Sequence, residues 1–307
     1  MKPALVLTMA VWTVAAAGPR EYRVPAGHAT LFARVIGRGS PIIVLHGGPD
    51  FDHTYLLPDL DRLADRYRLI YYDQRGRGRS AEGVDPEEVS LASDVDDIDR
   101  VRRYFGLRSA TILGHSWGGL LAAEYAIRYP HGASHLIFMN PAPVSAADYL
   151  RFRDFYRERQ GAAFDQLRAA AASDAYKAGD ADAVAAYYRM HFAPALQRPQ
   201  DLDRLLANMR PSFATGVLKA RRIEERLDED TWLSKGYDLL PKLSAVTVPT
   251  LVIAGDHDFI PADTVEHIAR AIPGARMVTL QQCGHFTYLE CPGAVRQTID
   301  AFFRRRR

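Results

Sequence analysis

The sequence contains little cysteine and little net charge, and each shortage argues against a class of protein. Only two of the 307 residues are cysteine. They form neither a CxxC pair nor a His/Cys cluster with zinc spacing, so no structural metal is expected. The formal net charge at pH 7 is only +2, which gives no reason to expect nucleic acid as a partner. No cofactor is implied by any segment.

The two cysteines, Cys283 and Cys291, lie close together in the chain. Their spacing alone does not show that their Cβ atoms face each other. A disulfide becomes possible if the protein is exported, because oxidising compartments preserve such bonds. Two buried free thiols are nevertheless the expectation from the sequence.

Long apolar runs are scarce as well, and the clearest one lies at the start of the chain. Lys2 is followed by the nearly all-apolar Ala4–Val14 and the small residues Ala15–Ala17. This pattern is typical of a secretory signal peptide over residues 1–17 and is too short to predict a membrane span. We therefore expect export to the periplasm or the medium, with no stable membrane association after cleavage. An apolar N-terminal helix or an uncleaved anchor is the alternative, and a protein that is not exported would be cytoplasmic.

Six short apolar runs predict the strands of a buried parallel sheet. Each is rich in Ile, Val and Leu, as strands covered on both faces are. Amphipathic stretches separate them, the clearest being Leu91–Phe105, which Gly106 is well placed to terminate. This alternation predicts right-handed crossovers and a doubly wound, mostly parallel α/β sheet. The runs are Pro41–Leu45, Leu69–Tyr72, Ala110–Leu113, His135–Met139, Thr250–Ala254 and Ala275–Leu280.

Two parts of the chain break the alternation. Residues 21–36 have the pattern of a leading antiparallel hairpin. Residues 143–240 are rich in Ala, Arg, Asp and Tyr and lack any strand-like run, so they predict a helical lid inserted after the sixth strand. The hydrolytic core would then consist of residues 18–142 and 241–307.

The strongest chemical signal is the segment Gly-His-Ser-Trp-Gly at residues 114–118, which fits the pattern G-x-S-x-G. It follows a predicted strand and precedes a helical stretch, which is the context that this nucleophile turn requires. Such a turn lifts the serine hydroxyl clear of the sheet and places it at a helix N-terminus, where the dipole favours developing negative charge. Ser116 is therefore the predicted nucleophile.

A serine hydroxyl needs a base, and His285 is the best placed of the ten histidines. It follows the last predicted strand, so its loop would overhang the same edge of the sheet. An orienting acid should follow the preceding strand, where Asp256 and Asp258 compete. Asp258 is preferred because it lies further out on the loop, and the order Ser, Asp, His is the one expected for this fold. The competing histidines are His46, His53, His115 and His257.

Acyl transfer also needs donors for an oxyanion. One is expected to be the backbone N–H of Trp117, which directly follows the serine. The other is expected from the loop His-Gly-Gly-Pro at residues 46–49, because glycines let the backbone approach a substrate closely. The N–H of Gly48 is the predicted donor. The Trp117 side chain either lines the pocket or packs in the core.

Three segments resemble the proline iminopeptidase branch of the α/β-hydrolases: residues 46–49, residues 114–119, and Asp-Gln-Arg-Gly-Arg-Gly-Arg-Ser at residues 73–80. The likeness extends over most of the predicted core. It implies an α/β-hydrolase fold and a serine aminopeptidase that releases N-terminal proline, or a similar residue, through an acyl-enzyme. The Asp-Gln-Arg-Gly segment is the most specific part, and we expect it to brace the nucleophile turn structurally.

The chain departs from that branch at Asp50, where the branch usually has glycine. A carboxylate there either disfavours an oxyanion or attracts a substrate amine. The branch also uses acidic lid residues to hold the free N-terminal ammonium of a peptide, and an acidic run extends here from Glu224 to Asp230. A solvated helix face is the alternative interpretation of that run. The candidate substrate-binding residues are Asp50, Glu224, Glu225 and Glu229.

Three functions follow from these observations. The first is the aminopeptidase, acting on small peptides, and the second is a carboxylesterase or lipase-like hydrolase of small esters. A catalytically inactive binding protein fits least, because no member of the triad is missing. Specificity depends on the lid, so a shared fold does not settle the substrate. The sequence does not indicate an oligomeric state.

Overall fold

The computed structural model describes residues 18–214 and 216–304. The predicted signal peptide, residues 1–17, lies outside the described residues. None of the helices in the described ranges is long and apolar enough to cross a membrane.

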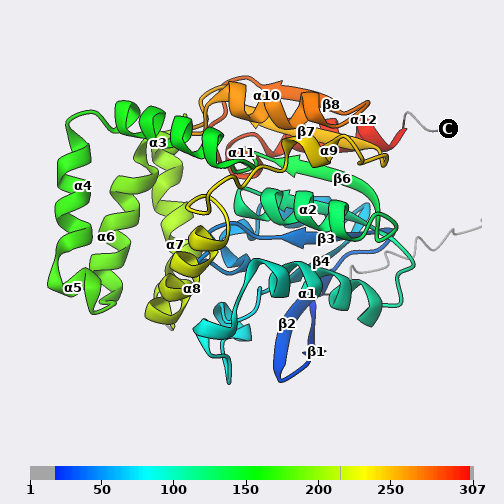
Figure 1. The fold of residues 1–307 in the computed structure, drawn as a ribbon, viewed down its shortest axis with the longest axis horizontal. Coiled ribbons are helices and arrows are strands. Elements are labelled where there is room, and N and C mark those ends of the chain that lie inside the picture. Colours follow the sequence, from blue (N-terminus) through cyan, green and yellow to red (C-terminus); the bar gives the residue numbers. More distant parts are fainter. Residues whose placement is uncertain (1–17, 215, 305–307) are drawn as a thin grey trace, which may run out of the picture.

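An eight-stranded sheet forms the centre of the molecule (Figure 1). Strands β3 to β8 pair in parallel, and a leading antiparallel hairpin adds β1 and β2 at one edge, next to β4. The spatial order is β1-β2-β4-β3-β5-β6-β7-β8, which confirms the predicted doubly wound sheet. The strands are β1 (Arg20–Ala26), β2 (Ala29–Ile36), β3 (Ser40–Leu45), β4 (Tyr67–Tyr72), β5 (Ala110–His115), β6 (Ala133–Met139), β7 (Thr250–Gly255) and β8 (Arg276–Leu280).

The core helices form where apolar residues recur with helical spacing. In α1, Val95, Ile98 and Val101 are buried, and Ser90 begins the helix with a capping box. Helix α2 packs against β3, β5 and β6, directly behind the nucleophile turn. The helices of the core are α1 (Leu91–Tyr104), α2 (Trp117–Arg128), α9 (Leu240–Leu243), α10 (Ala262–Ala271), α11 (Thr287–Glu290) and α12 (Pro292–Arg304).

The chain between β6 and β7 contains the helical insertion that the sequence predicts. Its first six helices lie together beyond one end of the sheet (Figure 1). Parallel strands end at the same edge, so this placement puts the insertion over the loops that follow the strands. We call these helices the lid. They are α3 (Ala146–Gln160), α4 (Ala163–Ala172), α5 (Asp174–Lys177), α6 (Ala181–Phe192), α7 (Leu202–Ala214) and α8 (Val217–Asp230).

The two cysteines form a disulfide, so the expectation of free thiols is wrong. Cys283 and Cys291 lie with their Cα atoms 6.2 Å apart, within the usual range for a disulfide. Sequence spacing could not reveal this pairing because the short helix α11 folds the intervening chain back. The bond closes the loop that carries His285.

Loss of this bond should destabilise the protein. For a loop with a sequence separation of 8, chain entropy alone predicts a loss of about 2–3 kcal/mol in the free energy of unfolding. We expect Cys291→Ser to lower that free energy by this amount in urea unfolding, and a reductant to do the same to the wild type. A reductant should leave Cys291→Ser unchanged. A wild type that is insensitive to reductant and as stable as the variant would show that the bond does not contribute.

Candidate active site

The turn between β5 and α2 holds Ser116 in a sharply bent conformation. Its backbone angles are φ 54° and ψ −121°, a region that side-chain-bearing residues rarely adopt. Neighbouring positions leave no room for a side chain. A Cβ atom on Gly114 would lie 2.1 Å from the Gly118 carbonyl oxygen, and one on Gly118 would lie 2.3 Å from that of Leu45. Any side chain at Gly114 or Gly118 would therefore clash with neighbouring backbone, so both positions of G-x-S-x-G need glycine. Ser116 lines the pocket.

His285 and Asp258 meet beside this turn. His285 Nδ1 lies 2.9 Å from Asp258 Oδ1, and both side chains are buried. The carboxylate accepts this hydrogen bond, so Nδ1 carries the proton and Nε2 is the basic nitrogen. Asp258 is further fixed by the Ile260 N–H at 2.9 Å. Ser116 and His285 both line the same pocket.

The fallback acid, Asp256, has other partners. Its Oδ1 lies 2.8 Å from Nδ1 of the half-exposed His257 and accepts the Cys283 N–H at 3.1 Å. These hydrogen bonds hold the pKa of Asp256 below its usual range against a raising effect of burial. The geometry therefore favours Asp258 as the partner of His285.

The buried Asn140, which was not predicted from the sequence, binds the carboxylate of Asp258. It follows β6 in the left-handed region with φ 48°, and its Nδ2 donates to Asp258 Oδ2 at 2.7 Å. Its Oδ1 accepts the Thr287 hydroxyl at 2.6 Å. The amide thus ties the acid loop to the chain that follows His285. A polar residue at the end of a parallel strand was the available signal.

The loop after β3 contains a backbone N–H without a hydrogen-bond partner among the described residues, at Gly48, which lines the pocket. The Gly47 N–H donates to the Tyr55 hydroxyl at 2.7 Å, whereas the Gly48 N–H has no partner among the described residues. Gly48 has φ 123°, and a Cβ there would lie 2.3 Å from the Asp50 nitrogen. The Trp117 N–H lies in the first turn of α2, where helix amides have no partner within the helix. These are the two donors expected for an oxyanion.

The Trp117 side chain packs in the core, the second of the two alternatives. It is fully buried, and its ring meets that of Trp232 edge-on at 5.4 Å between centroids. It does not line the pocket, which Trp232 does.

The competing histidines within the core have structural partners. His115 Nδ1 lies 2.7 Å from the Tyr55 hydroxyl and its Nε2 lies 3.1 Å from the His285 carbonyl oxygen. His46 Nε2 accepts the Gln74 N–H at 3.0 Å, so its Nδ1 carries the proton and donates to the Gly47 carbonyl. Burial lowers the pKa of both, that of His46 to about 3, so both rings are neutral.

The Asp-Gln-Arg-Gly segment is structural. The Gln74 N–H donates to His46 Nε2, and the Gln74 side chain donates through Nε2 to the His46 carbonyl at 2.8 Å. Arg75 and Arg77 form buried ion pairs with Asp97 and Asp94 of α1. The segment therefore fixes the loop that begins at His46 to α1 and the sheet, next to the nucleophile turn.

One buried cluster within residues 18–214 and 216–304 has the residue types of a metal site: Asp52, His53 and Asp73. Its ligand atoms are already hydrogen-bonded. His53 Nδ1 lies 2.6 Å from Asp73 Oδ1, the Arg79 N–H donates to Asp73 Oδ2, and Thr54 donates to Asp52. The cluster joins the short helix η1 (His53–Leu56) to the end of β4, and it does not line the pocket.

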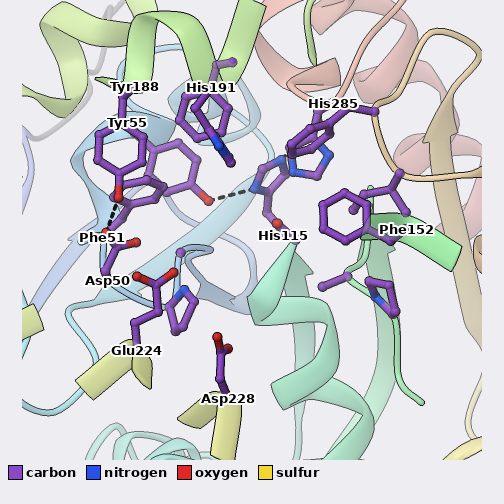
Figure 2. Close-up of a pocket in the computed structure, with 18 of the residues that line it drawn as sticks. Asp50, Phe51, Tyr55, His115, Phe152, Tyr188, His191, Glu224, Asp228 and His285 are labelled. Carbon is purple, nitrogen blue, oxygen red and sulfur yellow. Dashed lines mark hydrogen bonds between the residues drawn. The ribbon is translucent and has the colours of Figure 1, made fainter. Parts of the chain in front are cut away.

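Ser116 and His285 open into a cavity of about 190 Å³ between the core and the lid. Figure 2 shows His285 at one end of this pocket and the carboxylates of Asp50, Glu224 and Asp228 at the other. The wall between them is aromatic. It includes Phe51, Phe152, Tyr187, Tyr188, Phe192, Phe259 and Phe286.

The acidic end combines residues from two distant segments. Asp50 follows the loop after β3, whereas Glu224 and Asp228 lie one turn apart on α8. The Tyr188 hydroxyl of α6 donates to Asp50 Oδ2. Burial raises the pKa of Asp50 and raises that of Glu224 well above its usual range, with the charge of Asp50 adding to the effect on Glu224. Burial and the Asp50 charge raise the pKa of Asp228 to about 7.

The other two acidic candidates on α8 lie outside the pocket. Glu225 is exposed and pairs with Arg222 at 3.1 Å, and Glu229 is also exposed. Neither lines the cavity, whereas Asp228, which the sequence reasoning did not select, does. The helical period explains the division, because residues four apart share a face.

Comparison with known proteins supports a hydrolase. The model of the alpha/beta hydrolase fold family matches residues 40–292. A proline iminopeptidase from Heyndrickxia coagulans is 29% identical over 272 residues, which cover 87% of this chain and 91% of that protein. The crystal structure of a proline iminopeptidase from Mycobacterium smegmatis has a TM-score of 0.70 at 25% identity, over 93% of this chain and 98% of that one. A thermophilic esterase from Thermogutta terrifontis shares the fold alone, with a TM-score of 0.68 at 22% identity over 93% of this chain and 98% of that one.

The two candidate acids can be separated by mutation. We expect Asp258→Asn to slow labelling by a fluorophosphonate about 10⁴-fold. Both oxygens of Asp258 accept hydrogen bonds, from His285 and Asn140, whereas the amide has one oxygen and one NH₂ group. An NH₂ group that faces His285 would donate to Nδ1 and impose the wrong tautomer. Asp256→Asn, the matched control, should slow it only a few-fold. The labelling rate constant is the measurement, and the reverse ranking would reassign the acid.

Proposed function

The chain belongs to the alpha/beta hydrolase fold family, and from that premise we propose that it is a serine aminopeptidase that releases N-terminal proline, or a similar residue, from peptides. One observation carries the proposal: a single pocket has a hydroxyl and an imidazole at one end and three carboxylates at the other. A substrate that spans it needs a reactive carbonyl and, a short distance away, a positive charge. The N-terminal residue of a peptide has both.

The proposed acylation begins at Ser116. Its Oγ attacks the carbonyl carbon of the first residue, while His285 Nε2 takes the hydroxyl proton. Asp258 holds the imidazole in the correct tautomer and stabilises the imidazolium that forms. The carbonyl oxygen becomes an oxyanion between the N–H groups of Gly48 and Trp117, and each such donor typically contributes about 3–4 kcal/mol.

Collapse of this intermediate breaks the C–N bond. The imidazolium gives its proton to the leaving nitrogen, the shortened peptide departs, and the first residue stays on Ser116 as an ester. Water then attacks the ester carbonyl, and His285 acts again as the base. The free amino acid leaves, and the Ser116 hydroxyl is restored.

The acidic end is proposed to bind the substrate ammonium. Asp50, Glu224 and Asp228 have raised pKa values mainly because the pocket desolvates them, and the charge of Asp50 adds to the effect on Glu224 and Asp228. An ammonium group placed among them offsets that charge, which favours binding of a cation. The aromatic wall would enclose an apolar ring such as that of proline. A blocked N-terminus offers no charge and should bind poorly.

The departure at Asp50 is compatible with this mechanism. A carboxylate near an oxyanion would oppose it, but the Asp50 side chain is directed to Tyr188 and Glu224 at the acidic end (Figure 2). We therefore assign Asp50 to the amine rather than to the oxyanion.

A paired substrate panel tests the proposal against the esterase alternative. We expect turnover of proline 2-naphthylamide to exceed that of its N-acetylated form by at least 100-fold, because the acetyl group removes the ammonium. Ser116→Ala should abolish both amide and ester turnover while circular dichroism shows an intact fold. Rapid turnover of p-nitrophenyl acetate or butyrate without any amide turnover would favour the esterase and contradict the aminopeptidase.

The acidic end predicts a characteristic dependence on pH. The pKa of Asp228 is raised to about 7, so this carboxylate takes up a proton as the pH falls from 8 to 6, and the acidic end loses attraction for an ammonium group. We expect KM for proline 2-naphthylamide to rise over this range while KM for p-nitrophenyl acetate stays level. Measuring both substrates at each pH separates this effect from titration of His285.

Glu224→Gln should raise KM for the amine substrate about 10–100-fold, the loss expected for one charge-assisted hydrogen bond. Glu225→Gln is the matched control, because that carboxylate is exposed on the same helix. Equal effects of the two substitutions on KM would contradict the proposal that α8 contributes to the ammonium site.

A further inference from the structure

The loop that carries His285 is bound to the lid through its backbone. We call residues 283–291, closed by the disulfide, the base loop. The His285 N–H donates to the Ala195 carbonyl oxygen at 2.7 Å. Ala195 ends the short helix η5 (Ala193–Ala195), which directly continues α6 of the lid. The peptide unit of the proposed base is thus hydrogen-bonded to the segment by which the chain leaves α6.

A buried carboxylate strengthens this junction. Glu290 is 3% exposed, and its Oε2 accepts the Gly284 N–H at 2.7 Å. Its Oε1 accepts the Arg198 N–H at 2.7 Å, and the Gln197 N–H also donates to this carboxylate. One side chain therefore binds the residue before His285 and two residues of the lid segment. No step of the proposed mechanism uses it.

The base loop and the lid segment are tightly packed at Gly284. A Cβ atom on Gly284 would lie 2.2 Å from the Ala195 carbonyl oxygen and 2.8 Å from Glu290 Oε2. Burial raises the pKa of Glu290, while the three backbone N–H groups lower it. A buried carboxylate is stabilised by such donors, and it holds them in place in return. The two chain segments cannot separate without leaving a buried charge short of partners.

On the opposite side, His115 binds the His285 carbonyl oxygen at 3.1 Å. The backbone of His285 is therefore held on both sides, by the lid segment at its N–H and by His115 of the nucleophile turn at its carbonyl. Helix α6, from which the lid segment emerges, also carries Tyr188, the hydrogen-bond partner of Asp50. The contacts at the acidic end and those of the base loop belong to one continuous piece of chain.

We propose that Glu290 is a positioning residue, which sets the His285 imidazole relative to Ser116 by fixing the base loop to the lid segment 195–198. This inference rests on the proposed serine hydrolase function. Glu290 touches neither substrate nor reacting atoms, so it acts on the rate of acylation and not on amine binding. A displacement of about 1 Å in a catalytic group can cost about 100-fold in rate.

The test is Glu290→Gln in the mature full chain. The amide has nearly the shape of the carboxylate but turns an NH₂ group toward one set of N–H donors, so one side of the junction loses its acceptor. We expect the rate constant of fluorophosphonate labelling and kcat for proline 2-naphthylamide to fall together, about 10–100-fold. KM should stay within about threefold, since the acidic end is untouched.

The readout distinguishes positioning from stability. A variant that is merely less stable would label a smaller fraction of molecules at the wild-type rate constant, whereas a misplaced base slows labelling in every folded molecule. Glu124→Gln is the matched control, because that half-buried carboxylate of α2 accepts the Tyr237 hydroxyl at 3.0 Å and does not touch the base loop. It should label at the wild-type rate.

A wild-type rate constant in Glu290→Gln would overturn the inference. A wild type that the probe does not label would instead overturn the proposed function, so the two failures differ. If Glu290→Gln does not fold, Glu290→Asp serves as the second variant, because it keeps the charge but is too short to reach both segments. It too should slow labelling, and a wild-type rate constant would again contradict the proposal.

Discussion

The site depends on one backbone constraint, the bent conformation of Ser116 between β5 and α2. That turn forms only because Gly114 and Gly118 let β5, α2 and the loop after β3 come within contact distance of one another. The loop that contains Gly48, the proposed oxyanion donor, follows β3, and Trp117, the other proposed donor, begins α2. The strain of the turn is thus offset by the packing of three elements and not by any single bond.

Around this turn the molecule separates its charges. The ring of His115 lies against the imidazole of His285, and His191 lines the same pocket. Both are neutral because burial lowers their pKa values, that of His191 to about 3. At the far end, burial raises the pKa values of Asp50 and Glu224 instead. The neutral rings add no positive charge beside His285, whereas the carboxylates at the other end of the pocket, with Arg221 near them, favour a cation.

The sheet, its hairpin, the lid insertion and the nucleophile turn were predictable because local patterns encode them. Asn140, Tyr188 and Glu290 were not, since they act through partners 118, 138 and 92 positions away in the chain. The disulfide was missed because spacing does not describe how a loop folds back. The choice among the acidic residues of α8 was within reach. A spacing of four places Glu224 and Asp228 on one face and Glu225 and Glu229 on another, and the apolar Ile223 and Leu227 lie next to the first pair.

Asp50 follows Gly48 by two residues on one short, closely packed loop, so the proposed amine ligand and the proposed oxyanion donor share one piece of backbone. The acidic residues of α8 lie on a helix that contains neither the proposed nucleophile and base nor the proposed oxyanion donors. Substitutions on α8 can therefore alter the proposed amine site without changing the loop after β3. A substitution at position 50 would act on the proposed amine site and, through the shared loop, on the backbone next to the proposed oxyanion donor.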